Sequence, residues 1–314
     1  MDMLQQKTAA YEAIETLRRE GRFQSCSGNP VQLETATDRF IADMRRIQSE
    51  AAWKLGGIYL IAEIIQSVHR TDAGELMDDP SLPLDQKLRM SRALGRQSGM
   101  LQLTERFVDL LSPIITELAE RNGRDTRVLE LAGGAGSLSL ALGRAARNGR
   151  LPCRVTGTDI VDTYTKAAQE EASQEGLPAE FHTLDACRMD KLERGSADLV
   201  VISQSLHHFS PGQLALMIRG AKEAGSSAFI GLDGYRSLLL SAGVPLVAAM
   251  QGIWEFALDG LTSARKFYTE PELDAISEIA TTERNHLVLT RWPLTLVLVR
   301  FDGIRASEAS LPYA

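Results

Sequence analysis

Residues 128–140, VLELAGGAGSLSL, have the pattern of a strand, a glycine-rich loop and a helix, which predicts a ligand site at the edge of a parallel sheet. The run of residues 128–131 is short and mostly apolar, as expected of a buried strand. Residues 132–136 form a glycine-rich loop, in which missing Cβ atoms let a ligand approach the backbone. Apolar residues at 138, 140 and 142 then begin a helix. A strand, a glycine loop and a helix in this order predict a small-molecule site at the carboxyl end of the strand.

Beyond residue 123, short apolar runs alternate with helical stretches. This alternation predicts βαβ units and a parallel sheet. Two later runs are separated only by Trp292 and Pro293, which is too short for a crossover helix, so they predict an antiparallel hairpin. The predicted fold class is therefore α/β, with five parallel strands (127–132, 154–159, 179–184, 197–203 and 227–232) followed by the hairpin strands 286–291 and 294–301.

Helical segments are predicted before the sheet and within it. Residues 1–122 show apolar spacing of three or four, with breaks near Cys26–Pro30 and across 72–85. Residues 233–284 predict an insert of two or three helices between strands five and six. The expected domains are thus a helical region at 1–122, for lid formation or dimerisation, and a ligand-binding domain at 123–314. We expect both helical parts to cover the carboxyl edge of the sheet and enclose a small acceptor.

Composition narrows the class of protein. Hydrophobic residues make up 44% of the chain and charged residues 24%, as in ordinary globular proteins. The formal net charge of −7 disfavours binding to nucleic acid or to an anionic membrane. Cys26, Cys153 and Cys187 lie far apart and lack metal-ligand spacing, which favours reduced thiols and no metal. With no signal peptide evident, a cytoplasmic location is expected.

The stretch 237–254 is uncharged over 18 residues, near the length that spans a membrane. It contains Ser241, Gly243, Pro245, Gln251 and Gly252, which weaken it as a lipid-facing helix. A buried helix is the favoured interpretation, with a membrane-touching or dimer surface as the alternative.

Two positions distinguish a dinucleotide from S-adenosylmethionine as the cofactor, and a third suits either. The dinucleotide fingerprint Gly-x-Gly-x-x-Gly/Ala would place its third small residue at Ser139, which does not fit it. Asp159 ends the second strand and suits the ribose of either a dinucleotide or S-adenosylmethionine. Asp185 follows the third strand, where a carboxylate can accept the amino group of adenine. These positions favour S-adenosylmethionine.

Over residues 125–302 the chain resembles the class I S-adenosylmethionine-dependent methyltransferases. The matching segments are VLELAGGAGSLSL, VTGTDIV, FHTLDAC and ADLVVISQSLHHF. The resemblance implies a seven-stranded Rossmann-like sheet and S-adenosyl-L-methionine as cofactor. Ala132 stands where the family has its usual first glycine. By position, the resemblance assigns cofactor contacts to the first acid and glycine loop for the methionine end, and to later strand ends for ribose and adenine: Glu130, Ala132, Gly133, Gly134, Gly136, Asp159, Ile160, Asp185, Ala186 and Ser203.

The candidates for acceptor chemistry follow strands four and five. His207 and His208 suit a general base for a hydroxyl or amine, since the imidazole pKa lies near neutrality; helix packing is the alternative role. Arg236 can clamp a carboxylate in a bidentate manner, or pair with a surface acid. The other candidate acceptor contacts are Gln204, Ser205, Asp233 and Tyr235 by topology, and the aromatic residues Trp53, Tyr59, Trp254, Phe267 and Tyr268.

The sequence therefore predicts methyl transfer to a small-molecule acceptor at O, N, S or C. Two alternatives stay open: methylation of nucleic acid or protein, and cofactor binding by a regulator that transfers nothing. A homodimer is expected through the added helices.

Overall fold

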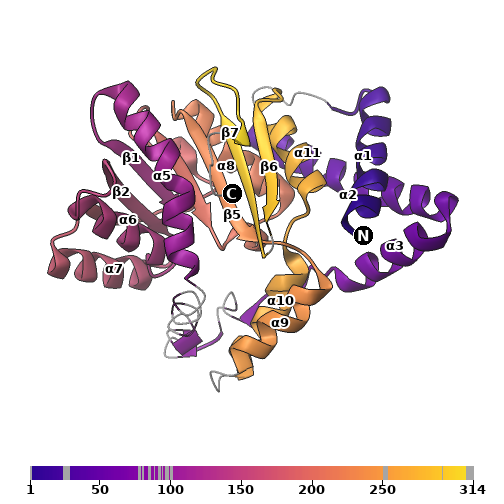
Figure 1. Cartoon of the computed structure of the whole chain (residues 1–314), viewed down its shortest axis with the longest axis horizontal. Coiled ribbons are helices and arrows are strands. Elements are labelled where there is room, and N and C mark those ends of the chain that lie inside the picture. Colours follow the sequence, from indigo (N-terminus) through magenta and orange to yellow (C-terminus); the bar gives the residue numbers. More distant parts are fainter. Residues whose placement is uncertain are drawn as a thin grey trace.

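The computed structural model describes residues 2–23, 29–76, 79, 81–83, 86, 87, 89, 90, 93, 95, 99, 102–249, 254–291 and 293–308. A seven-stranded sheet forms its centre, in the order β3-β2-β1-β4-β5-β7-β6 (Figure 1). The first five strands pair in parallel, and β7 pairs antiparallel with both β5 and β6. This confirms the predicted fold class. The strands are β1 (Thr126–Leu131), β2 (Cys153–Asp159), β3 (Ala179–Thr183), β4 (Leu199–Ser203), β5 (Ala228–Gly234), β6 (His286–Arg291) and β7 (Leu294–Arg300).

Each face of the sheet is covered by helices, and β4 shows how one strand serves both faces. Leu199 and Val201 pack toward α5 (Leu103–Asn122), α6 (Ser137–Arg147) and α7 (Asp162–Glu175). Val200 and Ile202 pack on the opposite side, with α8 (Pro211–Glu223) and α11 (Glu270–Thr281). Alternate residues of a strand point to opposite faces. Because both faces are buried, the strand is apolar throughout.

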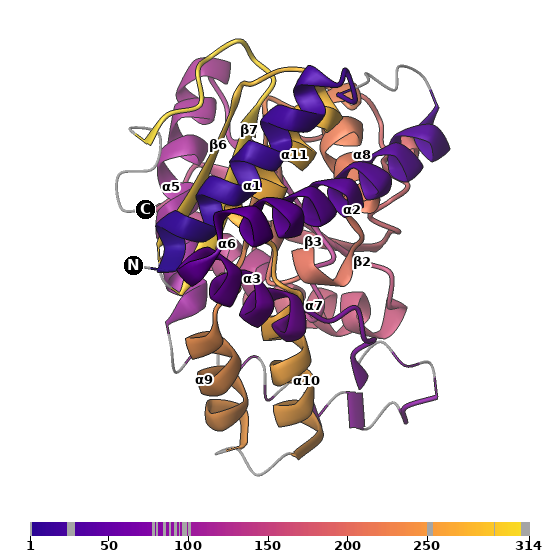
Figure 2. The same ribbon diagram turned by 90° about the vertical axis from the view of Figure 1, so that its right-hand side faces the viewer.

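The first two helices form a further layer on the α8 and α11 side (Figure 2). Leu33, Phe40, Ile41 and Met44 of α2 (Pro30–Leu55) are buried in the same core as α1 (Asp2–Arg19) and α8. The expectation that the whole N-terminal region covers the carboxyl edge was therefore wrong for α1 and α2. An apolar stripe on a helix is equally suited to packing over the face of a sheet, and α1 and α2 bury theirs in the core on the α8 and α11 side. α3 (Gly57–His69) packs on α1 and α2, and the segment after it reaches the carboxyl edge.

The insert forms three helices, where the sequence predicted two or three. α9 (Leu238–Ala249) and α10 (Trp254–Lys266) pack together and project below the sheet in Figure 1, while α11 joins the main body. The insert begins after Gly234, because Asp233 still belongs to β5. The prediction of a buried helix over 237–254 was only partly right, since Ser241 is buried but Leu246 is 66% exposed. None of the described helices combines the length and the apolar character needed to cross a membrane.

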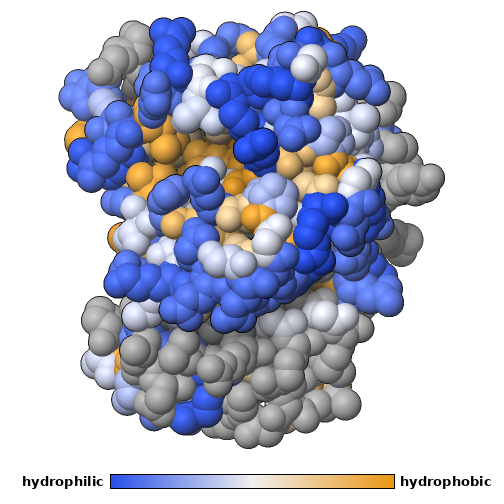
Figure 3. Space-filling model, turned by 90° about the vertical axis from the view of Figure 1, so that its left-hand side faces the viewer, coloured by the Kyte–Doolittle hydropathy of each residue, from blue (hydrophilic) through white to orange (hydrophobic). Residues whose placement is uncertain are grey.

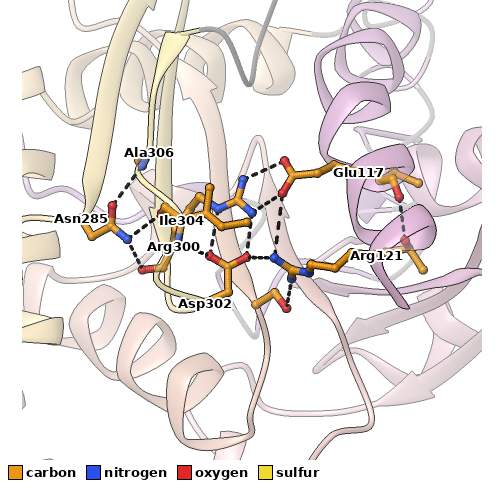
Figure 4. Close-up of polar contacts among 10 residues, drawn as sticks. Glu117, Arg121, Asn285, Arg300, Asp302, Ile304 and Ala306 are labelled. Atoms are coloured by element: carbon orange, nitrogen blue, oxygen red, sulfur yellow. Dashed lines mark hydrogen bonds and ion pairs between the residues drawn. The ribbon is translucent and has the colours of Figure 1, made fainter. Parts of the chain in front are cut away.

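A buried arginine fastens the end of the sheet to α5 (Figure 4). The Arg300 side chain is fully buried and donates to both oxygens of Glu117, at 2.9 Å and 2.5 Å. It also donates to Asp302, which in turn pairs with Arg121 at 2.6 Å. Because each charge has an opposite partner, burial of the guanidinium is tolerated. The network joins the last strand to the helix that precedes the first.

Apolar residues also reach the surface near α6 and α7. On the side of the molecule where these helices lie, they form a band framed by hydrophilic residues (Figure 3). A cleft of about 510 Å³ opens beside the glycine loop, and Ala135, Ser137, Leu140 and Ala141 contribute to its lining. The loop is therefore bordered by open space on its outer side.

Candidate active site

The glycine loop connects β1 to α6 and lies against the end of β2. Its backbone is held by two hydrogen bonds, from Gly133 N to Thr158 O and from Gly134 N to Asp159 Oδ2, both 2.8 Å long. Gly136 has a φ of 78°, and a Cβ there would lie 2.6 Å from the Phe181 ring. At Gly134, by contrast, a Cβ would meet no protein atom within 4 Å. The loop is thus packed beneath and open above.

Glu130 supports this loop from inside the protein. Its side chain is buried, and Oε2 accepts hydrogen bonds from the backbone (3.0 Å) and hydroxyl (2.5 Å) of Ser139. Oε1 accepts from the Ser203 hydroxyl at 2.8 Å. Burial raises the pKa of Glu130, although these hydrogen bonds oppose the rise. The predicted cofactor residues Glu130 and Ser203 therefore bond to each other and to α6, and a Cβ at Gly133 would strike the Glu130 carboxyl at 2.9 Å.

Asp159 lies between the glycine loop and the turn after β2. Besides Gly134 N, it accepts a hydrogen bond from Val161 N, at 2.8 Å on Oδ1. Burial raises the pKa of its carboxyl, while the backbone hydrogen bonds and the charge of the nearby His208 lower it. Ile160, next in the chain, is 67% exposed. The buried Asp159 carboxylate therefore links the glycine loop to the turn after β2.

The end of β3 lies beside the end of β2. Leu184 N donates to Asp159 O at 3.0 Å, and the exposed Asp185 accepts from Cys187 N at 2.9 Å. Ala186 is buried just beyond. The three strand ends therefore bring the glycine loop, Asp159 and Asp185 to one edge of the sheet, as predicted.

The next strand end carries a paired histidine. The helical turn η3 (Leu206–His208) follows β4, and His207 is buried within it. Its Nδ1 lies 2.8 Å from Asp233 Oδ2, the same oxygen that accepts from the His207 backbone N at 3.1 Å. The Phe267 ring meets the imidazole edge to face, with the ring centroids 4.9 Å apart. Asp233, at the end of β5, therefore fixes the orientation of this ring.

Three residues that the sequence did not suggest complete this group. Glu75 lies beyond α3 and is buried, with its Oε1 3.6 Å from His207 Nε2 and its Oε2 3.7 Å from His208 Nε2. On α10, Ser263 donates to Glu75 Oε2 at 2.8 Å, and Lys266 Nζ lies 3.1 Å from Oε1. The one available signal was the i, i+3 spacing of Ser263 and Lys266, which places both on one helix face.

Four other predicted acceptor contacts are partly or fully buried, and Ser205 and Gln204 have hydrogen-bond partners within the protein. Ser205 donates to Ala132 O at 2.9 Å, which ties the turn after β4 to the glycine loop. Gln204 has a φ of 54° and donates its backbone N–H to Leu232 O at 2.7 Å. Tyr235 is buried, and burial raises the pKa of its phenol. Tyr59 is half-buried on α3.

Arg236 has a partner within the protein. Its Nη2 lies 3.3 Å from Glu272 Oε1, which also accepts from Arg45 Nε at 2.7 Å. Burial by itself would raise the pKa of Glu272, but the charges of Arg236 and Arg45 outweigh it and hold that pKa far below its usual value. The clamp predicted for Arg236 is thus replaced by a pair with a buried acid.

Two aromatic candidates lie at the surface and in the core. Trp53 is 65% exposed, because it lies on the outer side of α2. Tyr268 is buried in the hydrophobic core, where its hydroxyl donates to Phe209 O at 2.7 Å. Trp254 begins α10, and its side chain, like Cys26, lies outside the described structure.

Comparison with known proteins gives one family and a set of similar folds. Residues 128–225 match a family model described as a methyltransferase domain. No curated protein matches the sequence. Among solved structures, the chain is similar to the plantazolicin methyltransferase BpumL in complex with SAH, at 12% identity and a TM-score of 0.52, covering 76% of this chain and 96% of that one.

Two further solved structures have lower TM-scores. The plantazolicin methyltransferase BamL has 14% identity and a TM-score of 0.49, with 67% of this chain and 90% of that one covered. Magnesium protoporphyrin IX methyltransferase from Synechocystis PCC 6803 has 18% identity and a TM-score of 0.42, with 70% and 88% covered. The match over residues 128–225 identifies this part of the chain as a methyltransferase domain, and the strand order and the glycine loop are those of a Rossmann-like methyltransferase fold.

Proposed function

We propose that this methyltransferase acts on a small molecule that carries a hydroxyl group, bound between the glycine loop and His207. The observation that carries this proposal is the pair of His207 and Asp233 at the strand ends beside the loop. In a parallel sheet, ligands bind at the carboxyl ends of the strands. The edge that holds the cofactor residues is therefore also the edge that holds the basic group.

Cofactor binding is assigned to the first three strand ends. The space above Gly134 accommodates the methionine end, with Ala132, Gly133 and Gly136 shaping the loop. Asp159 accepts from the ribose hydroxyls and Asp185 from the adenine amino group, with Ile160 and Ala186 beside them. A carboxylate has about four acceptor sites, so Asp159 can keep its two backbone bonds while it binds a sugar. When bound, the cofactor supplies a methyl group already activated on a sulfonium.

The acceptor residues supply orientation and a base. Asp233 holds His207 Nδ1, which leaves the Nε2 lone pair directed away from Asp233. Transfer of the methyl group to the acceptor oxygen would break the carbon–sulfur bond of the cofactor, and His207 Nε2 would take up the acceptor proton. Alignment of the two reactants in a site sheltered from water supplies most of the remaining rate enhancement.

The surroundings favour a small acceptor. Glu75 and Lys266 meet over η3, so the segment after α3 and the helix α10 cover the strand ends. A buried position of this kind suits a metabolite better than a polymer. BpumL, whose fold is similar, is a plantazolicin methyltransferase. The net charge of −7 argues against a nucleic-acid substrate.

A homodimer is part of this proposal. Ile58, Ile61, Ile64 and Ile65 of α3 are each at least 40% exposed. Such a row of large apolar side chains is typical of a contact surface. We expect a second copy to cover it, so that light scattering gives twice 34.4 kDa; a mass of one chain rejects the dimer.

Calorimetry with S-adenosylhomocysteine tests the cofactor assignment. Asp159→Ala should weaken binding by about 2–3 kcal/mol, because charge-assisted hydrogen bonds are lost. The matched control Asp162→Ala, at an exposed carboxylate three residues later at the start of α7, should bind as the wild type does. Equal affinity for both variants would contradict the assignment.

A panel of hydroxyl acceptors, assayed with the wild-type protein, tests the reaction itself. With a responsive acceptor, His207→Ala should lower the rate by roughly 10²–10⁴-fold and leave the affinity for S-adenosylhomocysteine unchanged. Tight cofactor binding without transfer to any acceptor would instead favour a regulator.

A further inference from the structure

We propose that Glu75, His207 and His208 form a binding site for a divalent transition-metal ion, with ligand preferences like those of zinc. We call these three residues the His–Glu cluster. One ligand comes from the segment after α3 and two come from η3, so folding alone brings them together. The site lies beside the predicted acceptor position.

The distances within the cluster are those of ligands around an ion. One ligand atom from each residue lies within 4.8 Å of the other two. The Glu75 carboxylate approaches both imidazoles, with Oε1 3.6 Å from His207 Nε2 and Oε2 3.7 Å from His208 Nε2. These separations are too long for direct hydrogen bonds. Ligands bound tetrahedrally to zinc at their usual distances lie about 3.4 Å from each other. Small side-chain adjustments would therefore close the cluster around an ion.

The partners of the cluster have the arrangement expected around metal ligands. A metal-binding histidine usually donates its other ring N–H to a carboxylate, which fixes the tautomer. For His207 this carboxylate is Asp233, whose Oδ2 lies 2.8 Å from Nδ1. Ser263 likewise donates to Glu75 Oε2, and Leu76 N donates to Asp259 Oδ1 at 2.6 Å, which anchors the segment carrying Glu75. The lone pairs of the ligands are thereby directed toward one another.

Lys266 explains how the cluster is balanced before an ion binds. Its ammonium lies 3.1 Å from Glu75 Oε1 and compensates the buried carboxylate. A divalent ion in the cluster would compete with this ammonium for the same oxygen. Removing the lysine charge should therefore strengthen ion binding, whereas a lysine that only supports the fold would have no such effect.

The consequence for catalysis rests on the proposed function. Two histidines and one carboxylate leave a coordination position open. An acceptor hydroxyl bound there would lose its proton to water more readily, because a cation lowers its pKa. In that state His207 Nε2 is a ligand, so the ion replaces it as the activating group. As in the proposed reaction, the bond between the acceptor oxygen and the methyl carbon would form while the carbon–sulfur bond breaks.

Cobalt titration of the chelator-treated, full-length protein tests the site. Co²⁺ should bind once per chain and give visible absorption of a low-coordinate ion. His208→Ala and Glu75→Gln should weaken binding more than tenfold, Asp233→Asn about tenfold to a hundredfold, and Lys266→Met should tighten it. His182→Ala is the control, because this exposed histidine also lies near a glutamate, at 3.7 Å from Glu180.

Cofactor binding serves as the second readout. Each variant is first shown to bind S-adenosylhomocysteine, so that loss of cobalt is not loss of fold; His208 is exposed, and its replacement should be tolerated. Wild-type protein that binds S-adenosylhomocysteine but not Co²⁺, or a His208→Ala variant that binds Co²⁺ as well as the wild type, overturns the metal site and leaves the proposed function standing. Failure to bind S-adenosylhomocysteine counts against the proposed function instead.

Discussion

Ala132 occupies a backbone conformation that suits glycine. Its φ is 49°, in the left-handed region where a Cβ clashes with the following carbonyl. It stands where related methyltransferases have their first loop glycine. The loop nevertheless closes, because the backbone bonds of Gly133 and Gly134 hold it against β2. The loop thus carries local strain that this chain retains.

Ala132→Gly should remove that strain. We expect the free energy of unfolding to rise by about 0.5–1 kcal/mol, the relief at φ being partly offset by a more flexible unfolded chain. Urea denaturation measures the change. Ala135→Gly, in the same loop but not at positive φ, should lower stability by a similar amount. A loss of stability in both variants would show that Ala132 is unstrained.

At the level of elements, the backbones of α2 and α8 lie unusually close to each other. Ser210 caps α8 by accepting from Gln213 N, and Asp38 of α2 accepts from Gly212 N at 2.7 Å. A Cβ at Gly212 would lie 2.3 Å from the backbone oxygen of Glu34. Since backbone cannot move aside as a flexible side chain does, the glycine permits this packing. The N-terminal helices are therefore attached to the sheet domain through a contact between backbones.

Gly212→Ala should separate the two helices and destabilise the protein by about 2–3 kcal/mol, the range for overpacked sites. Gly243→Ala is the matched control, also in a helix, where a Cβ would meet nothing within 4 Å. It should raise stability by about 0.5–1 kcal/mol through helix propensity. Equilibrium unfolding in urea compares them, and equal effects would contradict the close contact.

At the level of the whole molecule, carboxylates hold the amino ends of the strands. Asp198 accepts hydrogen bonds from Arg124 at 2.6 Å and 2.8 Å and from Arg127 N at 2.9 Å. Its backbone oxygen accepts from Ser227 N at 2.8 Å, so three strand starts converge there. Burial by itself would raise the pKa of Asp198, but the arginine hydrogen bonds outweigh it and hold that pKa well below its usual value.

This gives stability a defined dependence on pH. Because the folded-state pKa lies below that of the unfolded chain, ionised Asp198 stabilises the fold fully above about pH 4. That contribution is lost as the pH falls through the folded-state pKa. Asp198→Asn should cost about 2 kcal/mol at pH 7, and its difference from wild type should shrink steadily below pH 4.

Urea denaturation at a series of pH values measures this difference. Asp125→Asn, at an exposed acid 3.9 Å from Arg154, is the control and should follow the wild type throughout. A constant gap between Asp198→Asn and wild type from pH 7 to pH 3 would refute the assigned role of this carboxylate.

The sequence by itself determined the sheet and which residues lie at the carboxyl ends of its strands. Apolar runs, turn residues and the glycine loop are local signals, and each strand end follows its own strand in the chain. The places of Glu130, Asp159, Asp185 and His207 at or just after strand ends could therefore be predicted from the sequence. Parallel pairing then requires these strand ends to share one edge.

Only the tertiary structure decided which distant side chains meet there. Glu75 reaches His207 and His208 because of how α3 packs and where the chain leaves it, and Lys266 reaches Glu75 through the projection of α10. The rotation of each helix likewise exposes Trp53 and buries Tyr268. These contacts join residues far apart in sequence, and no periodic pattern encodes them, because they result from the packing of whole elements against one another.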